Sequence, residues 1–192
     1  SPTVTGQVMG DGVGIRECFE ALKPHWDRLR KETASFNTRD SHLRRGAGVA
    51  GMFYGCGNTS LPNPSTIRFG LKPDGRLSLH QGAVDIGQGS NTVITQIAAD
   101  AVGLPLPLID LVPPDTDLTP DCGKTSASRQ TFVTGMAAER AGQALRRMLL
   151  RLANAGEGAR LDLGPGTLRV NEGGLIREVD LQALPRDAHG YV

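Results

Sequence analysis

The sequence predicts an α+β fold in which antiparallel hairpins and short strands pack with two long helices. Three observations predict it. A hairpin pattern at residues 67–81 comes before a helical pattern at 91–102. A second helical pattern covers 131–153, and the tail 160–184 has the pattern of short strands joined by glycine turns. Hairpins interleaved with helices differ from the run of β-α-β units that builds a parallel sheet.

The hairpin is indicated by alternation and by turn chemistry. Apolar residues alternate along 67–71 and again along 77–79, and Pro73-Asp74-Gly75 lies in the turn between the two runs. In the helical segment that follows, one apolar stripe runs along residues 91–102. Gly103 directly after it is a natural C-terminal cap. We therefore expect a strand, a turn, a strand and a helix in this order.

The chain is expected to contain a helical connector at residues 1–43 and the α+β domain at residues 44–192. Apolar residues recur at helical spacing from Ile15 onward, and Pro24 should kink this helix or divide it in two. The apolar, glycine-rich segment 47–57 is expected to form a strand. The connector would then lead directly into the first strand of the domain.

Composition argues against several classes of partner. Basic and acidic residues nearly balance, at 21 Lys and Arg against 20 Asp and Glu. The net charge therefore gives no field that attracts nucleic acid or a membrane surface, and aromatic residues, at 4%, are too few for a base-stacking platform. No apolar run is long enough to span a bilayer, and the first residues lack the regions of a signal peptide. We expect no nucleic-acid partner and no membrane span.

The cysteines and histidines predict no metal site in the chain. Cys18, Cys56 and Cys122 are far apart and form no C-x-x-C pair, and the histidines lack metal-ligand spacing. A disulfide framework is also not expected, and reduced thiols fit a cytoplasmic location. Because the chain does not begin with Met, we expect it to be an excised part of a longer protein.

The first candidate site is the Gly-Gln-Gly turn at residues 87–89, which precedes a helix. Unpaired N–H groups in a first helical turn favour anions, and glycines let a ligand approach the backbone closely. Alternatively, these glycines only shape a tight turn, with Ser90 or Asn91 capping the helix. Asp85 could contact a ligand, or it could accept the hydrogen bonds of an Asx-type turn. A dinucleotide fingerprint is excluded, because Thr92 occupies the place of its third glycine.

The second candidate site is the hydroxyl-rich segment 121–130, which leads into the second long helix. The Gly-Lys-Thr at 123–125 does not make a phosphate loop, because Leu118 stands where that motif needs a glycine. The hydroxyl groups could bind a ligand or could serve only as helix caps. Two glycine- and serine-rich helix entries in one domain favour a binding role.

Considered together, the two segments resemble the molybdenum-cofactor-binding subunit of the xanthine dehydrogenase and aldehyde oxidase family. In that family a hairpin leads into a G-Q-G turn and a helix, as in residues 74–106 here. A D-T-x-x-x-P segment with S-x-S then precedes a second helix, as in residues 115–145. The upstream stretch 44–55 resembles a strand of the same subunit, and the similarity covers residues 44 to 150.

The resemblance implies a molybdopterin cofactor, in bacterial members usually the cytosine dinucleotide form. The pterin sulfurs hold the molybdenum, and no protein side chain is a metal ligand. The cofactor-binding residues that the resemblance implies are Gly87, Gln88, Gly89, Ser90, Thr125, Ser126, Ala127 and Ser128.

The resemblance also implies an oxidoreductase that hydroxylates an aldehyde or an N-heterocycle with oxygen from water. Electrons leave through iron–sulfur clusters, and often through FAD, on other domains or subunits. The rest of the large subunit is a further expected partner. The segment with the family's catalytic glutamate has no match here, so no catalytic residue is predicted and the chain is expected to be inactive alone. Two other functions remain open, a structural or assembly domain of such a complex and an unrelated nucleotide-binding module.

Overall fold

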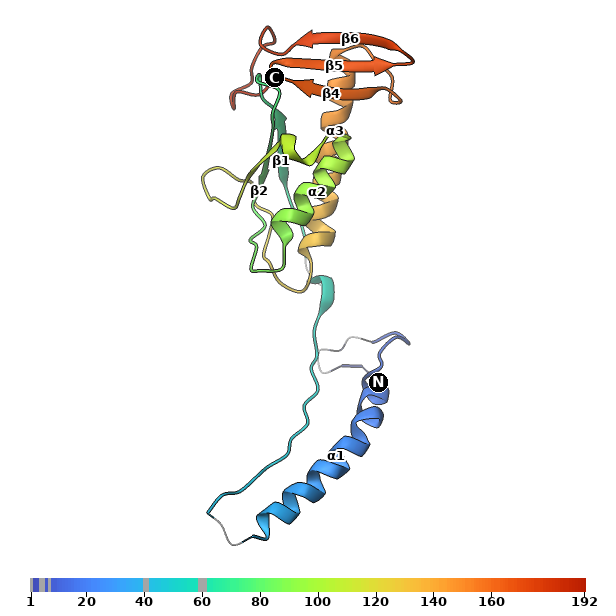
Figure 1. Ribbon diagram of the computed structural model, residues 1–192, viewed down its shortest axis with the longest axis vertical. Helices are drawn as coiled ribbons and strands as arrows, with labels where there is room; N and C mark the ends of the chain where they lie inside the picture. The colour runs from blue at the N-terminus through green and yellow to red at the C-terminus, as the bar shows by residue number, and fades with distance from the viewer. Residues whose placement is uncertain (1, 4–5, 7, 40–41, 59–61) are drawn as a thin grey trace. The chain divides into compact units, whose positions relative to one another are not determined.

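The protein is divided into two compact units, Ser1–Tyr54 and Gly55–Val192, in a computed structural model (Figure 1). The structure describes residues 2–3, 6, 8–39, 42–58 and 62–192. None of its described helices is both long enough and apolar enough to cross a membrane.

The first unit contains one long helix, α1 (Ile15–Asn37), which continues through Pro24. Pro24 therefore does not divide it into two helices. None of its residues is buried, and its apolar residues at helical spacing, such as Phe19 and Leu22, are 42% and 48% exposed. The helix α1 thus has the predicted apolar stripe, but the stripe is not buried in a hydrophobic core.

The expected strand at residues 47–57 is wrong. Residues 47–55 have no regular secondary structure, and Cys56–Asn58 form the short 3-10 turn η1. Within the first unit, Gly51 lies against α1 instead, so that a Cβ added to it would be 3.3 Å from Cζ of Phe19. A strand needs a neighbour to hydrogen-bond with, and the described part of this unit contains none.

The second unit is built on the sheet of β1 (Ile67–Leu71), β2 (Leu77–Gln81) and β3 (Ile109–Val112). The hairpin β1–β2 is confirmed, with antiparallel pairing. However, β2 and β3 pair in parallel, because α2 (Ser90–Val102) crosses over between them. The fold is α+β as predicted, with one β-α-β crossover that the sequence pattern did not predict.

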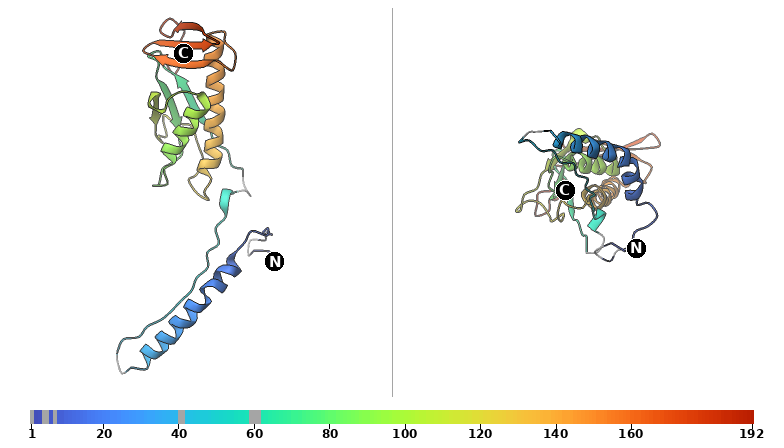
Figure 2. Two further views of the ribbon diagram at one scale, coloured as in Figure 1. Left: turned by 45° about the vertical axis from the view of Figure 1, so that its right-hand side comes forward. Right: turned by 90° about the horizontal axis from the view of Figure 1, so that it is seen from below.

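The core lies between this sheet and two helices, α2 and α3 (Gly135–Leu152). Figures 1 and 2 show the helices side by side against the sheet. Their close approach depends on Gly142 of α3, where an added Cβ would lie 2.6 Å from Cβ of Ala101 on α2. The one-turn π-helix η3 (Gln130–Thr134) precedes α3. The fully buried apolar side chains include Leu71, Leu77, Leu79, Ile94, Val102 and Leu149.

The tail forms short strands joined by turns, as expected, and they make a second sheet at the C-terminal end of α3. Its antiparallel strands are β4 (Arg160–Gly164), β5 (Thr167–Glu172) and β6 (Leu175–Asp180) (Figure 2). Leu168 and Val170 on β5 are fully buried and join the core. The chain then returns to β1, where the Val192 N–H donates to the Leu71 carbonyl at 3.0 Å.

Candidate functional site

The structure brings the two candidate segments together. Residues 84–90, here called the glycine turn, connect β2 to α2, and residues 123–128, here called the serine loop, precede η3. The Thr125 hydroxyl donates a hydrogen bond of 2.8 Å to the Val84 carbonyl, and the Gln88 carboxamide donates one of 3.2 Å to the same oxygen. The two segments, far apart in sequence, are thus joined by a hydrogen bond.

The glycine turn is organised by the carboxylate of Asp85. It accepts hydrogen bonds from the backbone N–H groups of Gly87, Gly89 and Asn91 at 2.9, 3.2 and 3.1 Å. The donors from Asn91 and Gly87, with a smaller contribution from Gly89, lower the pKa of Asp85 below its ordinary value. Of the two roles considered for Asp85, the structure therefore shows the Asx-type turn.

The expected cap of the helix is wrong. Neither Ser90 nor Asn91 caps α2 with its side chain, and the N-cap residue is Gly89, at φ +79°. Asp85 supplies the acceptor oxygens instead, because the turn folds its carboxylate back onto the start of the helix. Gly87 also has a positive φ, +98°, so both glycines are required by backbone conformation.

Several groups of the glycine turn nevertheless remain available to a ligand. The backbone N–H groups of Gln88, Ser90 and Thr92 donate to none of the described residues, although Ser90 is only 1% exposed. A Cβ added at Gly87 or Gly89 would meet nothing within 4 Å, so the backbone there faces open space. The Gln88 carboxamide is exposed but engaged, since it bonds Val84, Ser90 and the Ile86 N–H.

The serine loop presents free hydroxyl groups on a strained backbone. Ser126 and Ser128 are exposed, and their hydroxyls make no hydrogen bond with any described residue. Ala127 and Ser128 have φ of +53° and +56°, a conformation that is unfavourable for residues with a Cβ. The Gly57 N–H donates to the Ala127 carbonyl at 2.6 Å and helps to hold this conformation. Strain of this kind is typical of ligand-binding loops.

Sequence reasoning missed the residues that support the serine loop from inside. Gln130 is buried, and its carboxamide donates to the Gly123 carbonyl and to the Thr125 hydroxyl at 3.1 and 3.2 Å. Arg129 is 1% exposed, although an arginine at a helix start is ordinarily a surface residue. No local pattern could have identified either, because their burial depends on segments distant in the chain.

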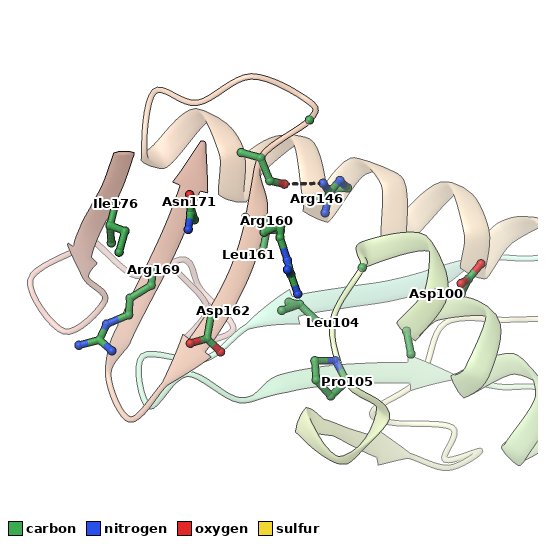
Figure 3. Close-up of a pocket in the computed structure, with 14 residues that line it drawn as sticks. Asp100, Leu104, Pro105, Arg146, Arg160, Leu161, Asp162, Arg169, Asn171 and Ile176 are labelled. Atoms are coloured by element: carbon green, nitrogen blue, oxygen red, sulfur yellow. Dashed lines mark hydrogen bonds between the residues drawn. The ribbon is translucent and has the colours of Figure 1, made fainter. Parts of the chain in front are cut away.

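A pocket lies elsewhere and includes none of the candidate residues. Its volume is about 1020 Å³, and it lies between the C-terminal end of α2, α3 and the second sheet (Figure 3). Three arginines line it, but Arg146 donates to backbone carbonyls and Arg169 pairs with Glu178. Two aspartates also line it, so its charge is nearly balanced. We therefore keep the candidate site at the glycine turn and serine loop, which the Thr125–Val84 hydrogen bond joins and which carry donors without a partner among the described residues.

The thiols and acidic side chains of the described residues form no metal centre. No group of three His, Cys, Asp or Glu side chains among them is arranged to hold a metal ion. The three cysteines are free. Cys122 is buried, where its thiol donates to the Thr66 carbonyl and accepts from the Gly82 N–H. Its role in the described structure is to connect the segment before the serine loop to β1 and β2.

Comparison with known families excludes one of the functions that the sequence left open. A family model described as a molybdopterin cofactor-binding domain matches residues 21–190. The chain belongs to this family. An unrelated nucleotide-binding module is therefore no longer a candidate, and the glycine turn and serine loop both lie within the matched region of the molybdopterin cofactor-binding domain.

Relatives of this molybdopterin cofactor-binding domain are xanthine dehydrogenases. A putative xanthine dehydrogenase molybdenum-binding subunit of Escherichia coli (strain K12) is 32% identical over 145 residues, 71% of this chain and 18% of that protein. A xanthine dehydrogenase of Drosophila pseudoobscura pseudoobscura is 34% identical over 142 residues, 73% of this chain and 10% of that protein. The chain thus spans less than a fifth of the length of either relative.

A solved structure agrees with the assignment to the xanthine dehydrogenase and aldehyde oxidase family. The aldehyde oxidoreductase from Desulfovibrio desulfuricans superposes with a TM-score of 0.50 at 30% sequence identity, covering 79% of this chain and 16% of that one. The predicted α+β fold of a molybdenum-cofactor-binding domain is confirmed.

The residues at the site fit the chemistry of a phosphate-bearing pterin. Free N–H groups at the start of α2 and unpaired hydroxyls of the serine loop are donors suited to phosphate and ring oxygens. The nearby carboxylate that could repel an anion, Asp85, has its oxygens occupied by backbone donors. The open space at Gly87 and Gly89 leaves room for close approach. We find no group in the two segments that conflicts with the cofactor.

Proposed function

We propose that the chain forms one wall of the cofactor site in a molybdenum hydroxylase. The observation that carries the proposal is the hydrogen bond from Thr125 to Val84, which unites the glycine turn and the serine loop. The proposed binding residues are Gly87, Gln88, Gly89, Ser90, Thr125, Ser126, Ala127 and Ser128. The form of the cofactor is proposed to be molybdopterin cytosine dinucleotide.

The residues of the chain would bind and orient the cofactor. The N–H groups of Gln88 and Ser90 would donate to its polar atoms, and Gly87 and Gly89 would let it approach the backbone. The Ser126 and Ser128 hydroxyls would add hydrogen bonds without adding charge. When bound, the cofactor supplies the metal and the electron acceptor for hydroxylating an aldehyde or an N-heterocycle with oxygen from water.

The chain is proposed to work as part of a larger assembly. It spans 18% and 10% of the two relatives compared above, and we propose that the rest of a large subunit, iron–sulfur clusters and in many cases FAD complete the enzyme. No residue of the chain is assigned a catalytic role, and the chain alone is proposed to be inactive. We propose that the functional domain begins at residue 44. We also propose that the protein is located in the cytoplasm.

The test is to measure the cofactor content of the large subunit that carries this chain, expressed in a host that synthesises the cofactor. Molybdenum is measured by elemental analysis and pterin by the fluorescence of its oxidised form. We expect both in the unchanged protein and a loss of both in Gln88→Ala and in the double variant Ser126→Ala, Ser128→Ala. Gln182→Ala, an exposed glutamine in the turn that follows β6, is the matched control.

The outcomes separate the proposals. If the unchanged protein contains neither molybdenum nor pterin, the proposed function is wrong. If it contains both and the variants match the control, Gln88 and the two serines are not binding residues. In that case a structural or assembly role for these two segments is the better explanation.

A further inference from the structure

The side chain of Arg129 connects the base of the serine loop to a distant segment. Its Nη1 donates to the carbonyls of Cys122 and Lys124 at 2.7 and 3.1 Å. Its Nε bonds the Asn63 carboxamide oxygen, and its Nη2 donates to the Pro64 carbonyl at 2.7 Å. One guanidinium therefore joins residues 63–64 to Cys122 and Lys124, which lie on either side of Gly123 at the start of the serine loop.

The charge of this guanidinium has no counterion within the described part of the chain. Arg129 is 1% exposed, and all of its acceptors are neutral carbonyl or carboxamide oxygens. None of the ion pairs between described residues includes it. A buried, unpaired cation is unfavourable unless its hydrogen bonds are satisfied. The presence of such a cation indicates that the hydrogen bonds of Arg129 are needed at this position.

Gly123 provides the space for this arrangement. An added Cβ would lie 2.8 Å from Nη1 and 3.0 Å from Nη2 of Arg129, and its φ is +69°. The neighbouring Gln130 extends the network, since its carboxamide oxygen is 3.4 Å from Nη1 while its nitrogen donates to Gly123 and Thr125. The guanidinium, the glycine and the carboxamide thus form one unit under the loop.

We propose that Arg129 is the positioning residue of the cofactor site, which rests on the function proposed above. By holding the Cys122 and Lys124 carbonyls, Arg129 fixes the entrance of the serine loop and, through Gln130, the orientation of the Thr125 hydroxyl. This restraint keeps Ala127 and Ser128 at their unfavourable positive φ and the two serine hydroxyls exposed. Its uncompensated charge also favours an anionic group bound at this loop.

Arginine replacements in the same large subunit test the proposal. Arg129→Met removes the charge and the donors, and Arg129→Lys keeps the charge without the planar fork. Arg147, an exposed arginine of α3, gives the matched controls Arg147→Met and Arg147→Lys. For each protein we would measure molybdenum and pterin content, amide hydrogen exchange of residues 121–130 in the cofactor-free form, and the midpoint of unfolding.

We expect Arg129→Met to lower cofactor content by roughly tenfold or more, the effect of losing one to two buried charge-assisted hydrogen bonds. Exchange should become faster in residues 121–130 but not in α2 or α3. Arg129→Lys should be intermediate, and the Arg147 variants unchanged. Normal cofactor content in Arg129→Met would overturn the proposal, as would exchange that rises equally throughout the core.

A glycine variant keeps the proposal testable if Arg129→Met does not fold. Gly123→Ala places a Cβ against the guanidinium, and Gly173→Ala is the control, because Gly173 also has a positive φ, +59°, but has open space around it. We expect loss of cofactor only in Gly123→Ala. Normal content in both Gly123→Ala and Arg129→Lys would overturn the proposal. If the unchanged protein contains no cofactor, the proposed function is wrong. Amide hydrogen exchange of residues 121–130 would still show whether Arg129 holds the serine loop.

Discussion

Asp85 illustrates how one side chain can fix a binding turn before any ligand arrives. Its two oxygens accept three backbone N–H groups, and Gly87 and Gly89 adopt the positive φ that makes this possible. The order of these residues is visible in the sequence, and an Asx-type turn was one of the two roles it indicated. The bond to Asn91, which replaces a helix cap, was not predictable, because it depends on how the turn meets α2.

The first prediction concerns the pH dependence that Asp85 gives to stability. Its pKa in the folded protein is lowered, so its carboxylate stabilises the fold at pH values above the ordinary carboxyl pKa of about 3.9. The contribution is lost as the pH falls through the lower, folded-state value. Chemical unfolding at several pH values should show Asp85→Asn less stable than the unchanged chain at pH 7, with the difference shrinking in acid. A difference that stays constant with pH would contradict this.

The second prediction concerns the strain at Ala127, which has φ +53°. Ala127→Gly should keep or raise the free energy of unfolding, because glycine adopts this conformation without a steric penalty. Ala127→Val should lower it by about 1–2 kcal/mol, because a branched Cβ is unfavourable there. Denaturant unfolding of both variants measures the effect. Equal stability of the glycine and valine variants would show that the loop relaxes and stores no strain.

The helices and strands that depend on the residue pattern within one segment were predictable from the sequence. Features that depend on contacts with segments distant in the sequence were not. The hairpin β1–β2, α2 and its cap at Gly103 follow from alternation, turn residues and one apolar stripe. The parallel pairing of β2 with β3 does not, because it depends on how α2 packs across the sheet. The segment 47–55 has the composition of a strand but lacks a neighbouring strand. Arg129 was missed at the site for the same reason.

The third prediction concerns the contact between α2 and α3. A methyl group at Gly142 would lie 2.6 Å from Cβ of Ala101 and 2.9 Å from the Ala98 carbonyl, so Gly142→Ala must separate the helices. We expect a loss of about 1–3 kcal/mol in the free energy of unfolding, although alanine favours a helix more than glycine does. Arg147→Ala, exposed on the same helix, should change it little. A more stable Gly142→Ala variant would mean that the helices adjust freely.

For the whole molecule, the distribution of buried residues separates the two units. The core side chains belong to Gly55–Val192, whereas α1 of the first unit has no buried residue. The glycine turn, the serine loop and Arg129 with its partners also belong to the second unit. Folding of the second unit and its site should therefore depend little on α1, which leaves the apolar stripe of α1 with no role in that core.

The last prediction follows from this separation. A chain of residues 55–192 should unfold cooperatively, with a midpoint within about 3 °C of the full chain, the shift that roughly 1 kcal/mol produces at this size. Removal of residues 187–192 should lower the midpoint more, because Tyr191 hydrogen-bonds His80 at 2.5 Å and packs on Gly70. Calorimetry of the three chains compares them. If the chain lacking residues 187–192 keeps its midpoint and the chain of residues 55–192 shows no cooperative transition, the expected independence of the second unit is wrong.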